Sequence, residues 1–438
     1  MTSQKRTEYV NRLTAGTLWN ALSAILAQGG VFLAHIVLAN LVGRAAFGHF
    51  SVVVATINSV AGVSQLAMAS TATKFVAEFR NSNPRAAAGV AILASRVTRW
   101  MGVAAGLALV VAAPLLAESV LRTPEIATSF RVAGGVVLFS VWLTAPGGVL
   151  AGLEAFRNLA AASAVGAIAY VGLVPLLGSR LGVAGAVGGT MTAAALRWMV
   201  LEYFAGRRIS TIASAGGPTI GDRERLILTR FALPAALAGS TTLPALWIAT
   251  AVLMRQSDGA AEVALASAAL SIKNLVVFLP GLMGNVATAV MNSARGDNRP
   301  DVFRNTFHAN LYATSTVIVV IAVLLWLSAE RVITLYGPDF NSGAAVLRIM
   351  LWVALFEALG AAVYQVILSH GLMWRSFATI ALPRDVLFVA LTLVLAPAWG
   401  AVGFAAAYAM AWGAGFAVTV ITAYYLEPDL FRQKRRTP

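Results

Sequence analysis

The sequence has no cysteine and little charge. Without cysteine, neither disulfide frameworks nor cysteine-ligated metal sites can form. Asp, Glu, Lys and Arg together make up 11% of the 438 residues, whereas soluble proteins carry about 25% charged residues. This scarcity of charge excludes an ordinary soluble enzyme.

Common enzyme signatures are missing as well. The sequence contains neither GxSxG nor HExxH, and none of its four lysines follows a glycine as a P-loop requires. Histidine occurs only at His35, His49, His308 and His370, which fall on separate segments. The sequence therefore predicts no metal site, no cofactor and no catalytic residue, and we expect the protein not to be an enzyme.

Long apolar runs dominate what is present. Hydrophobic residues make up 59% of the chain, and the mean hydropathy is +0.78. A helix crosses a bilayer in about 20 residues, and it satisfies its own backbone hydrogen bonds there. We predict an all-α integral membrane protein with about twelve transmembrane helices, at residues 16–42, 47–73, 87–117, 131–153, 159–178, 182–206, 229–254, 263–291, 305–328, 343–369, 374–396 and 399–425.

The basic residues indicate the orientation of these helices. The net charge is +14, and with both termini inside, the inner segments hold 22 basic residues and the outer segments hold 6. Basic residues concentrate on the cytoplasmic side of membrane proteins. Both termini are therefore predicted to be cytoplasmic. This distribution favours contact with anionic membrane lipid and argues against nucleic acid as a partner.

The chain divides into two similar halves. Asn58 corresponds to Asn274 at an offset of 216, and Gly182 corresponds to Gly400 at an offset of 218. With six helices in each half, the repeats are parallel. The predicted parts are an N-terminal tail (1–15), an N-terminal six-helix lobe (16–206), a cytoplasmic linker (207–228), a C-terminal six-helix lobe (229–425) and a basic tail (426–438).

Small and polar residues follow one face of the second helix in each half. Asn58 and Gln65 belong to this stripe in the first half, and Asn274 lies beside Lys273 in the second. We predict that these residues bind substrate in a water-filled cavity, although such stripes also serve helix packing. Arg44 and Arg255, at the outer ends of the first helix of each half, are further substrate-binding candidates, with snorkelling to the interface as the alternative.

Charged residues within the apolar helices concentrate in the second half. Glu357, Arg384 and Asp385 lie within predicted spans, and Arg384 and Asp385 follow Pro383, which is expected to break the helix. Adjacent helical residues point about 100° apart, so we expect Arg384 and Asp385 to have different partners. Glu357 is expected to pair with Lys273 or Arg384. The three residues either form static ion pairs or exchange H⁺ or Na⁺ to drive transport.

Three segments resemble a known family. Val37–Phe79, LYGPDF at Leu335–Phe340 and WGAVG at Trp399–Gly403 resemble bacterial polysaccharide-biosynthesis exporters of the Wzx type, oligosaccharide flippases of the multidrug/oligosaccharidyl-lipid/polysaccharide (MOP) superfamily. The resemblance implies a MATE-like fold, with two six-helix lobes around a cavity that opens alternately to each side. This sequence departs in one respect from the cationic cavity that the resemblance implies, because Ile57 stands in the first half where Lys273 stands in the second.

The resemblance implies a flippase for polyprenyl-pyrophosphate-linked oligosaccharide in the assembly of cell-surface polysaccharide, such as O-antigen of lipopolysaccharide or exopolysaccharide. Partners would be the lipid-linked oligosaccharide, membrane lipid, and a polymerase and glycosyltransferases of the same pathway. A cation-coupled multidrug or lipid exporter is the alternative within the superfamily. A membrane-embedded glycan polymerase or glycosyltransferase, using Glu118 or Glu125, is the alternative from another class.

Overall fold

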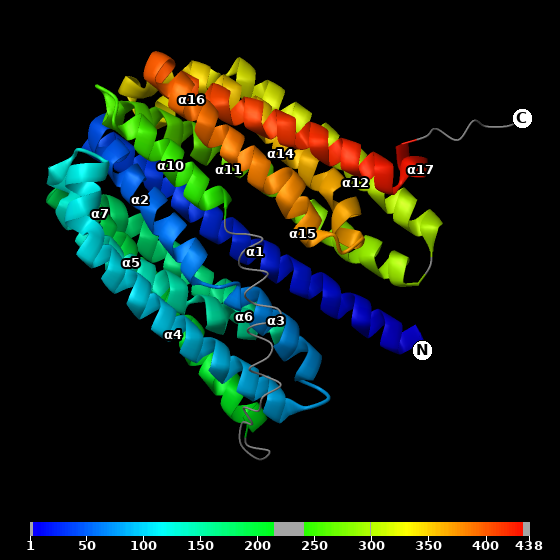
Figure 1. The fold of residues 1–438 in the computed structure, drawn as a ribbon. Helices are drawn as coiled ribbons and strands as arrows, with labels where there is room; N and C mark the ends of the chain where they lie inside the picture. The colour runs from blue at the N-terminus through cyan, green and yellow to red at the C-terminus, as the bar shows by residue number, and fades with distance from the viewer. Residues whose placement is uncertain (1–2, 214–240, 298, 432–438) are drawn as a thin grey trace, which may run out of the picture. The chain divides into compact units, whose positions relative to one another are not determined.

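Helices form the regular structure of the chain. The computed structural model describes residues 3–213, 241–297 and 299–431, and within these ranges it contains helices and no strand. The helices group into an N-terminal unit, Met1–Trp247, and a C-terminal unit, Ile248–Pro438. Figure 1 shows the course of the helices in each unit.

The N-terminal unit is built around α1, which packs along α7, and around α4, which packs along α5. A Cβ atom on Gly106 would lie 2.7 Å from the carbonyl oxygen of Gly134, so α4 and α5 touch backbone to backbone there. The elements in order are α1 (Ser3–Val42), α2 (Arg44–Ser64), α3 (Met68–Phe79), α4 (Pro84–Pro114), the π-helical η1 (Leu115–Val120), the 3₁₀-helical η2 (Pro124–Ile126), α5 (Ala127–Trp142), α6 (Thr144–Gly152), α7 (Phe156–Ala213) and α10 (Thr242–Met254), which ends in the C-terminal unit.

The second predicted span, 47–73, is two helices. Leu66 and Ala67 have φ angles of 46° and 52°, a left-handed conformation that interrupts the helix between α2 and α3. Gln65 caps the C-terminal end of α2. Gln65 keeps the αR conformation, and its N–H donates to the carbonyl oxygen of Ala61 at 3.0 Å, so the helical register with Asn58 runs as far as Gln65 and ends there.

The long helix α7 is a pair of antiparallel helices. Gly182 has φ 64° and ψ −152°, which is not helical. A Cβ atom on Gly189 would lie 2.7 Å from the carbonyl oxygen of Leu173. Sixteen residues of straight helix would separate these positions by about 24 Å, so the chain reverses direction at Gly182.

The C-terminal unit contains the remaining elements. Tyr336 and Phe340, from the LYGPDF segment, are both buried, and their ring centroids lie 5.7 Å apart. This segment therefore anchors the start of α14 in the core. The elements are α11 (Gly259–Gly296), α12 (Pro300–Leu327), α13 (Ala329–Ile333), the 3₁₀-helical η4 (Thr334–Tyr336) and η5 (Pro338–Gly343), α14 (Ala344–Ser369), α15 (Met373–Ser376), the π-helical η6 (Phe377–Ala381), α16 (Leu382–Leu426) and α17 (Pro428–Phe431).

The reversal in α7 has a counterpart in α16. Gly400 has φ 53° and ψ −132°, close to the angles of Gly182. A Cβ atom on Gly403 would lie 2.1 Å from the carbonyl oxygen of Leu395, and one on Gly185 would lie at the same distance from the carbonyl oxygen of Leu177. These contacts repeat at the offset of 218 residues, so the two units share the hairpin in backbone detail.

The fold prediction is confirmed. Nine helical stretches in the described ranges are long and apolar enough to cross a membrane. Two of them, Phe156–Thr211 and Met373–Leu426, have 56 and 54 residues and contain the reversals at Gly182 and Gly400. If each of these two stretches is counted as a pair of helices, and the shorter apolar helix Thr242–Met254 is added, the helices correspond to the twelve predicted spans. Residues 229–240 of the seventh predicted span, 229–254, lie outside the described residues.

The structure overlaps the predicted tails and linker only in part. Helix α1 begins at Ser3, so most of the predicted N-terminal tail (1–15) is helical. Helix α7 continues to Ala213 and includes the start of the predicted linker. Residues 214–228 of the linker and 432–438 of the C-terminal tail lie outside the described residues.

Candidate functional site

The C-terminal unit holds a charge pair within its apolar helices. Lys273 of α11 is 2% exposed, and its Nζ donates to Oε2 of Glu357 on α14 at 2.5 Å. Nζ also lies 5.4 Å from the centroid of the Tyr408 ring. Glu357 is 33% exposed, so the buried ammonium is neutralised by a carboxylate that reaches the surface of the unit.

A second charge pair lies on α16. Arg384 donates through Nε at 3.0 Å and Nη2 at 2.7 Å to Oδ1 of Asp385. The expectation that these neighbours have different partners was therefore wrong. The long arginine side chain bends back to its neighbour although the two Cβ atoms point in different directions. Asp385 is 3% exposed and Arg384 is 20% exposed.

The backbone before these two residues departs from α-helix. The π-helical segment η6, Phe377–Ala381, ends just before Pro383 in the first turn of α16. Proline lacks the N–H that would bond the carbonyl four residues earlier, and a wider turn at this place is the break that the sequence predicted. Gly415, on the returning half of α16, makes room for Arg384, since a Cβ atom there would lie 3.0 Å from Arg384 Cδ.

Aromatic rings connect the two pairs. The ring centroids of Tyr408 and Trp412 lie 4.0 Å apart. The Cζ atom of Arg384 lies 4.1 Å from the Trp412 centroid. Such cation–π contacts favour a charge in a low-dielectric site. We call this group the C-terminal charge network; its members are Lys273, Glu357, Arg384, Asp385, Tyr408 and Trp412.

The network is electrically balanced and has two accessible members. Each buried charge, on Lys273 and on Asp385, has a partner that is more exposed, Glu357 and Arg384. A balanced network is tolerated within apolar helices, whereas an unpaired charge there is costly. Adding a proton or a cation at Glu357 would compete with Lys273 and unbalance the network. The described residues contain no cluster of three His, Cys, Asp or Glu side chains that could hold a metal ion.

The predicted substrate-binding residues fall in separate places. Asn58 and Asn274 are both exposed, whereas Ile57 and Lys273 are both buried, so the repeat preserves the orientation of the two helices. Lys273 therefore points into its unit, away from the face of Asn274. Arg44 begins α2 and Arg255 is exposed in the turn between α10 and α11. Fourteen residues of helix, about 21 Å, separate Arg44 from Asn58.

Glu118 and Glu125, the candidate carboxylates of the enzymatic alternative, lie on short irregular helices. Glu118 belongs to η1. Glu125 belongs to η2, and its Oε1 lies 3.8 Å from Nε2 of His49.

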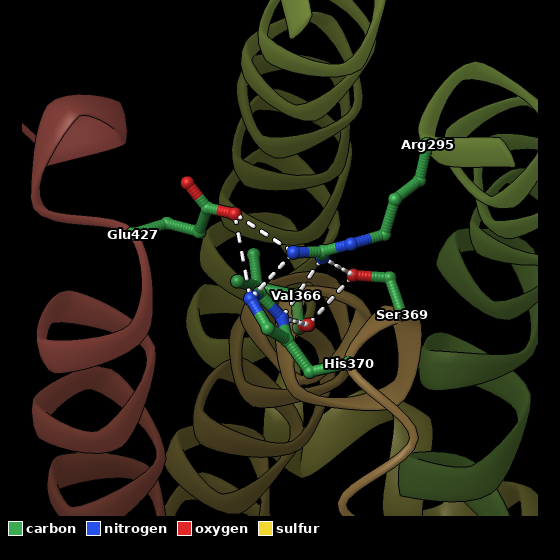
Figure 2. Close-up of polar contacts among 5 residues, drawn as sticks. All are labelled: Arg295, Val366, Ser369, His370 and Glu427. Carbon is green, nitrogen blue, oxygen red and sulfur yellow. Dashed lines mark hydrogen bonds and ion pairs between the residues drawn. The ribbon is translucent and has the colours of Figure 1, made fainter. Parts of the chain in front are cut away.

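A polar cluster that the sequence did not reveal joins three helix ends (Figure 2). Arg295 at the end of α11 donates to Ser369 Oγ at 2.7 Å, where α14 ends. Its two terminal nitrogens lie 2.9 Å and 2.6 Å from the ring nitrogens of His370. It also donates to Oε1 of Glu427, just after α16, at 3.1 Å. Arg295 lies 74 to 132 positions from these partners in the chain, so no local spacing could have indicated the cluster.

The N-terminal unit has a simpler contact at the corresponding place. Arg80, at the end of α3, donates to the carbonyl oxygen of Gly152 at 3.1 Å and pairs with Glu154. Gly152 corresponds to Gly371 in the repeat, next to His370. In both units an arginine thus holds the loop that follows the fourth span.

Comparisons with known proteins agree with this architecture. Residues 234–394 match the MatE family model. The EPS I polysaccharide export inner membrane protein EpsE of Ralstonia nicotianae is 28% identical over 193 residues, which cover 44% of this chain and 44% of that protein. EpsE of Ralstonia solanacearum is 27% identical over 200 residues, 45% of this chain and 46% of that protein. The matched region thus spans less than half of each relative.

Solved structures share the fold over nearly the whole chain. A multidrug resistance MATE family transporter of the MOP superfamily, in an inward-facing conformation, has a TM-score of 0.72 at 17% identity and covers 94% of this chain and 96% of that one. A MOP superfamily transporter from Pyrococcus furiosus has a TM-score of 0.70 at 16% identity, with 96% of each chain covered. The protein is therefore a multi-pass membrane protein with the MATE fold. The MatE match and the similarity to EpsE confirm the resemblance to the MOP superfamily seen in the sequence.

Proposed function

We propose that the protein exports a lipid-linked oligosaccharide across the bacterial cytoplasmic membrane for the assembly of cell-surface polysaccharide. The observation that carries this proposal is the similarity to EpsE, a polysaccharide export inner membrane protein, over about 200 residues. The MATE fold supports transport as the activity. Nothing in the proposal requires catalysis, and both termini would face the cytoplasm.

In this proposal the exposed amides serve the glycan. Asn58 and Asn274 occupy equivalent exposed positions on the second helix of their lobes. An amide both donates and accepts hydrogen bonds, which suits the hydroxyl groups of a sugar. Arg44 and Arg255 would attract the anionic head group at the outer side. The lobes would open alternately to the cytoplasm and to the outside.

The C-terminal charge network would couple transport to an ion. Glu357 is the member most accessible to water, and Lys273 holds it at 2.5 Å. Protonation of Glu357, or binding of Na⁺ to it, would release the ammonium and disturb the packing of α11 against α14. Lys273 therefore acts on the coupling carboxylate. It makes no direct contact with substrate in this scheme, since it is 2% exposed.

A deletion strain tests the proposal. If the protein exports a lipid-linked oligosaccharide, its loss should leave that intermediate on the cytoplasmic side and reduce surface polysaccharide, and mass spectrometry of extracted lipids identifies the intermediate. The wild-type gene should reverse both effects. Normal surface polysaccharide with no accumulated intermediate would contradict the proposal.

A second candidate is a cation-coupled multidrug or lipid exporter. The observation in its favour is the structural similarity to a multidrug resistance MATE transporter over 94% of this chain. Drug susceptibility of the same deletion strain separates the two candidates. Greater susceptibility to cationic drugs with unchanged surface polysaccharide favours the drug exporter, whereas the reverse pattern favours the glycan exporter.

A further inference from the structure

The N-terminal unit contains an arginine in an apolar helix whose charge is not balanced. Arg197 lies on the second half of α7, where its side chain packs over Gly166 of the first half. A Cβ atom on Gly166 would lie 3.0 Å from both Cβ and Cδ of Arg197. The glycine thus leaves space for the arginine stem, as Gly415 does for Arg384 in the other unit.

The two arginines are related by the internal repeat. At the offset of 218 residues, Gly166 corresponds to Arg384 and Arg197 corresponds to Gly415. In each hairpin an arginine therefore packs over a glycine at the corresponding position. The arginine is on the second helix of the hairpin in the N-terminal unit and on the first helix in the C-terminal unit. The difference lies in the neighbouring anion. Arg384 bonds to Asp385, whereas the residue that corresponds to Asp385 is Ala167.

The polar contacts of Arg197 leave most of its donors unused. Its Nη2 donates to Ser163 Oγ at 3.4 Å, which is long for a hydrogen bond. Its Nε is buried without a hydrogen-bond partner, and among the described residues no carboxylate forms an ion pair with it. A guanidinium is always charged and has five N–H donors. Such a group within apolar helices is stabilised when an anion binds to it.

Two hydroxyl groups position the arginine. Ser163 is 2% exposed, and its Oγ lies 2.7 Å from Oγ of Ser23 on α1. Arg197 itself is partly exposed, so a ligand outside the unit can reach it. A guanidinium held in place in this way is suited to phosphate, which it binds through paired, charge-assisted hydrogen bonds.

The depth of the site fits the phosphate of a membrane lipid. Arg197 follows the reversal at Gly182 by fifteen residues, about 22 Å of helix, in a hydrocarbon core about 30 Å thick. With the reversal on the outer side, as the predicted topology has it, Arg197 lies toward the cytoplasmic leaflet. The lipid-linked oligosaccharide of the proposed function would enter from this leaflet.

We propose that Arg197, positioned by Ser163 and Ser23, binds a phosphate group of the lipid-linked substrate on the cytoplasmic side of the N-terminal unit. This inference rests on the proposed function for the identity of the substrate. The site belongs to one unit alone because Ala167 stands in the N-terminal unit where Asp385 stands in the other. In the C-terminal unit the corresponding charge is already satisfied by Asp385.

Binding measurements on the full-length protein in neutral detergent test the site. The probes are a polyprenyl diphosphate and, separately, phosphatidylglycerol. We expect Arg197→Gln to weaken binding of the polyprenyl diphosphate about tenfold, the effect of losing one charge-assisted contact, and Arg197→Lys to weaken it less. The matched control is Arg99→Gln, since Arg99 in the same unit is already paired with Glu202 at 2.6 Å; its binding should equal that of the wild type.

The outcomes separate this site from the proposed function. Equal binding of the polyprenyl diphosphate by Arg197→Gln and the wild type overturns the site and leaves the proposed function standing. Binding of phosphatidylglycerol alone, even if it depends on Arg197, overturns the assignment to substrate and counts against the proposed function too. Thermal unfolding checks that the variants fold. Because Arg197→Gln removes an unbalanced charge, its unfolding temperature without ligand should be at least that of the wild type.

Discussion

Lys273 and Glu357 join α11 to α14 through a 2.5 Å contact in which the ammonium is buried and the carboxylate is partly exposed. Lys273 is 2% exposed, and Glu357 is 33% exposed. This asymmetry determines what each substitution leaves behind. Removing the carboxylate leaves a buried ammonium, whereas removing the ammonium leaves a carboxylate that reaches water.

Glu357→Gln should therefore destabilise the protein more than Lys273→Met. Removing one partner of a buried pair costs about 3–5 kcal/mol, whereas replacing both by apolar groups is often neutral. Lys273→Met combined with Glu357→Leu should recover most of the loss. Thermal unfolding in detergent measures all three. The control is Arg348→Gln, from the exposed pair with Glu330, where we expect a change below about 1 kcal/mol. Equal losses of stability in Glu357→Gln and Lys273→Met would show that the burial of Lys273 does not affect the cost of breaking the pair.

Asp385→Asn should reduce the dependence of transport on an ion gradient. The amide keeps the shape of the carboxylate and loses its charge, so Arg384 is left unbalanced beside Trp412, 4.1 Å away. Uptake into vesicles with an imposed pH or Na⁺ gradient measures this dependence. Arg348→Gln again serves as a control. Coupling equal to that of the wild type in both Asp385→Asn and Glu357→Gln would leave the network a static structural element.

Alanine at the two reversal glycines should be unequally harmful. Both Gly182 and Gly400 have backbone angles that other residues adopt only at a cost of about 1–3 kcal/mol. A Cβ atom at Gly400 would also lie 2.4 Å from Oε2 of Glu262, which accepts a hydrogen bond from the Ala401 N–H, whereas nothing lies within 4 Å at Gly182. We expect Gly400→Ala to lower the unfolding temperature more than Gly182→Ala.

Gly188 provides the control for this comparison. It is helical and has open space around its Cβ position. Alanine favours helix over glycine by about 1 kcal/mol, so Gly188→Ala should leave the unfolding temperature unchanged or raise it. If Gly400→Ala and Gly188→Ala had the same effect on the unfolding temperature, the reversal at residue 400 would not depend on glycine.

Arg295→Gln should loosen the ends of three helices. The arginine bonds to Ser369 and Glu427 and lies against His370, so its loss removes the contacts that join α11 to α14 and α16 there (Figure 2). Hydrogen exchange should speed up in residues 366–370 and 423–431, while the core of α14 keeps its protection. Arg304→Gln is the control, because the contact of Arg304 with the exposed Asp301 is 3.9 Å long. Unchanged exchange at both helix ends would mean that apolar packing alone holds them.

The sequence contained enough to predict the helices and their repeat. Apolar length and the need to satisfy backbone hydrogen bonds in lipid define the spans. The match of Gly182 to Gly400 was visible because a chain reversal with positive φ requires glycine in both halves. These features depend on local chemistry, which a single sequence records.

Partner choice among the charges was harder to predict. Glu357 was expected to pair with Lys273 or Arg384. It pairs with Lys273 because α11 packs against α14, which the sequence does not show. The bond between Arg384 and Asp385 depends on how a flexible side chain folds back. The cluster around Arg295 depends on helix ends far apart in the chain. Such contacts follow from tertiary packing, which has no local spacing pattern.

A reconstituted flipping assay tests the central claim most directly. The purified protein is placed in vesicles that contain a lipid-linked oligosaccharide with a fluorescent sugar, and a membrane-impermeant quencher reports how much label reaches the outer leaflet. The account predicts that more label is quenched than in protein-free vesicles, and that Arg197→Gln slows this movement while Arg99→Gln does not. Quenching at the protein-free level by a folded protein that transports a cationic drug would contradict it.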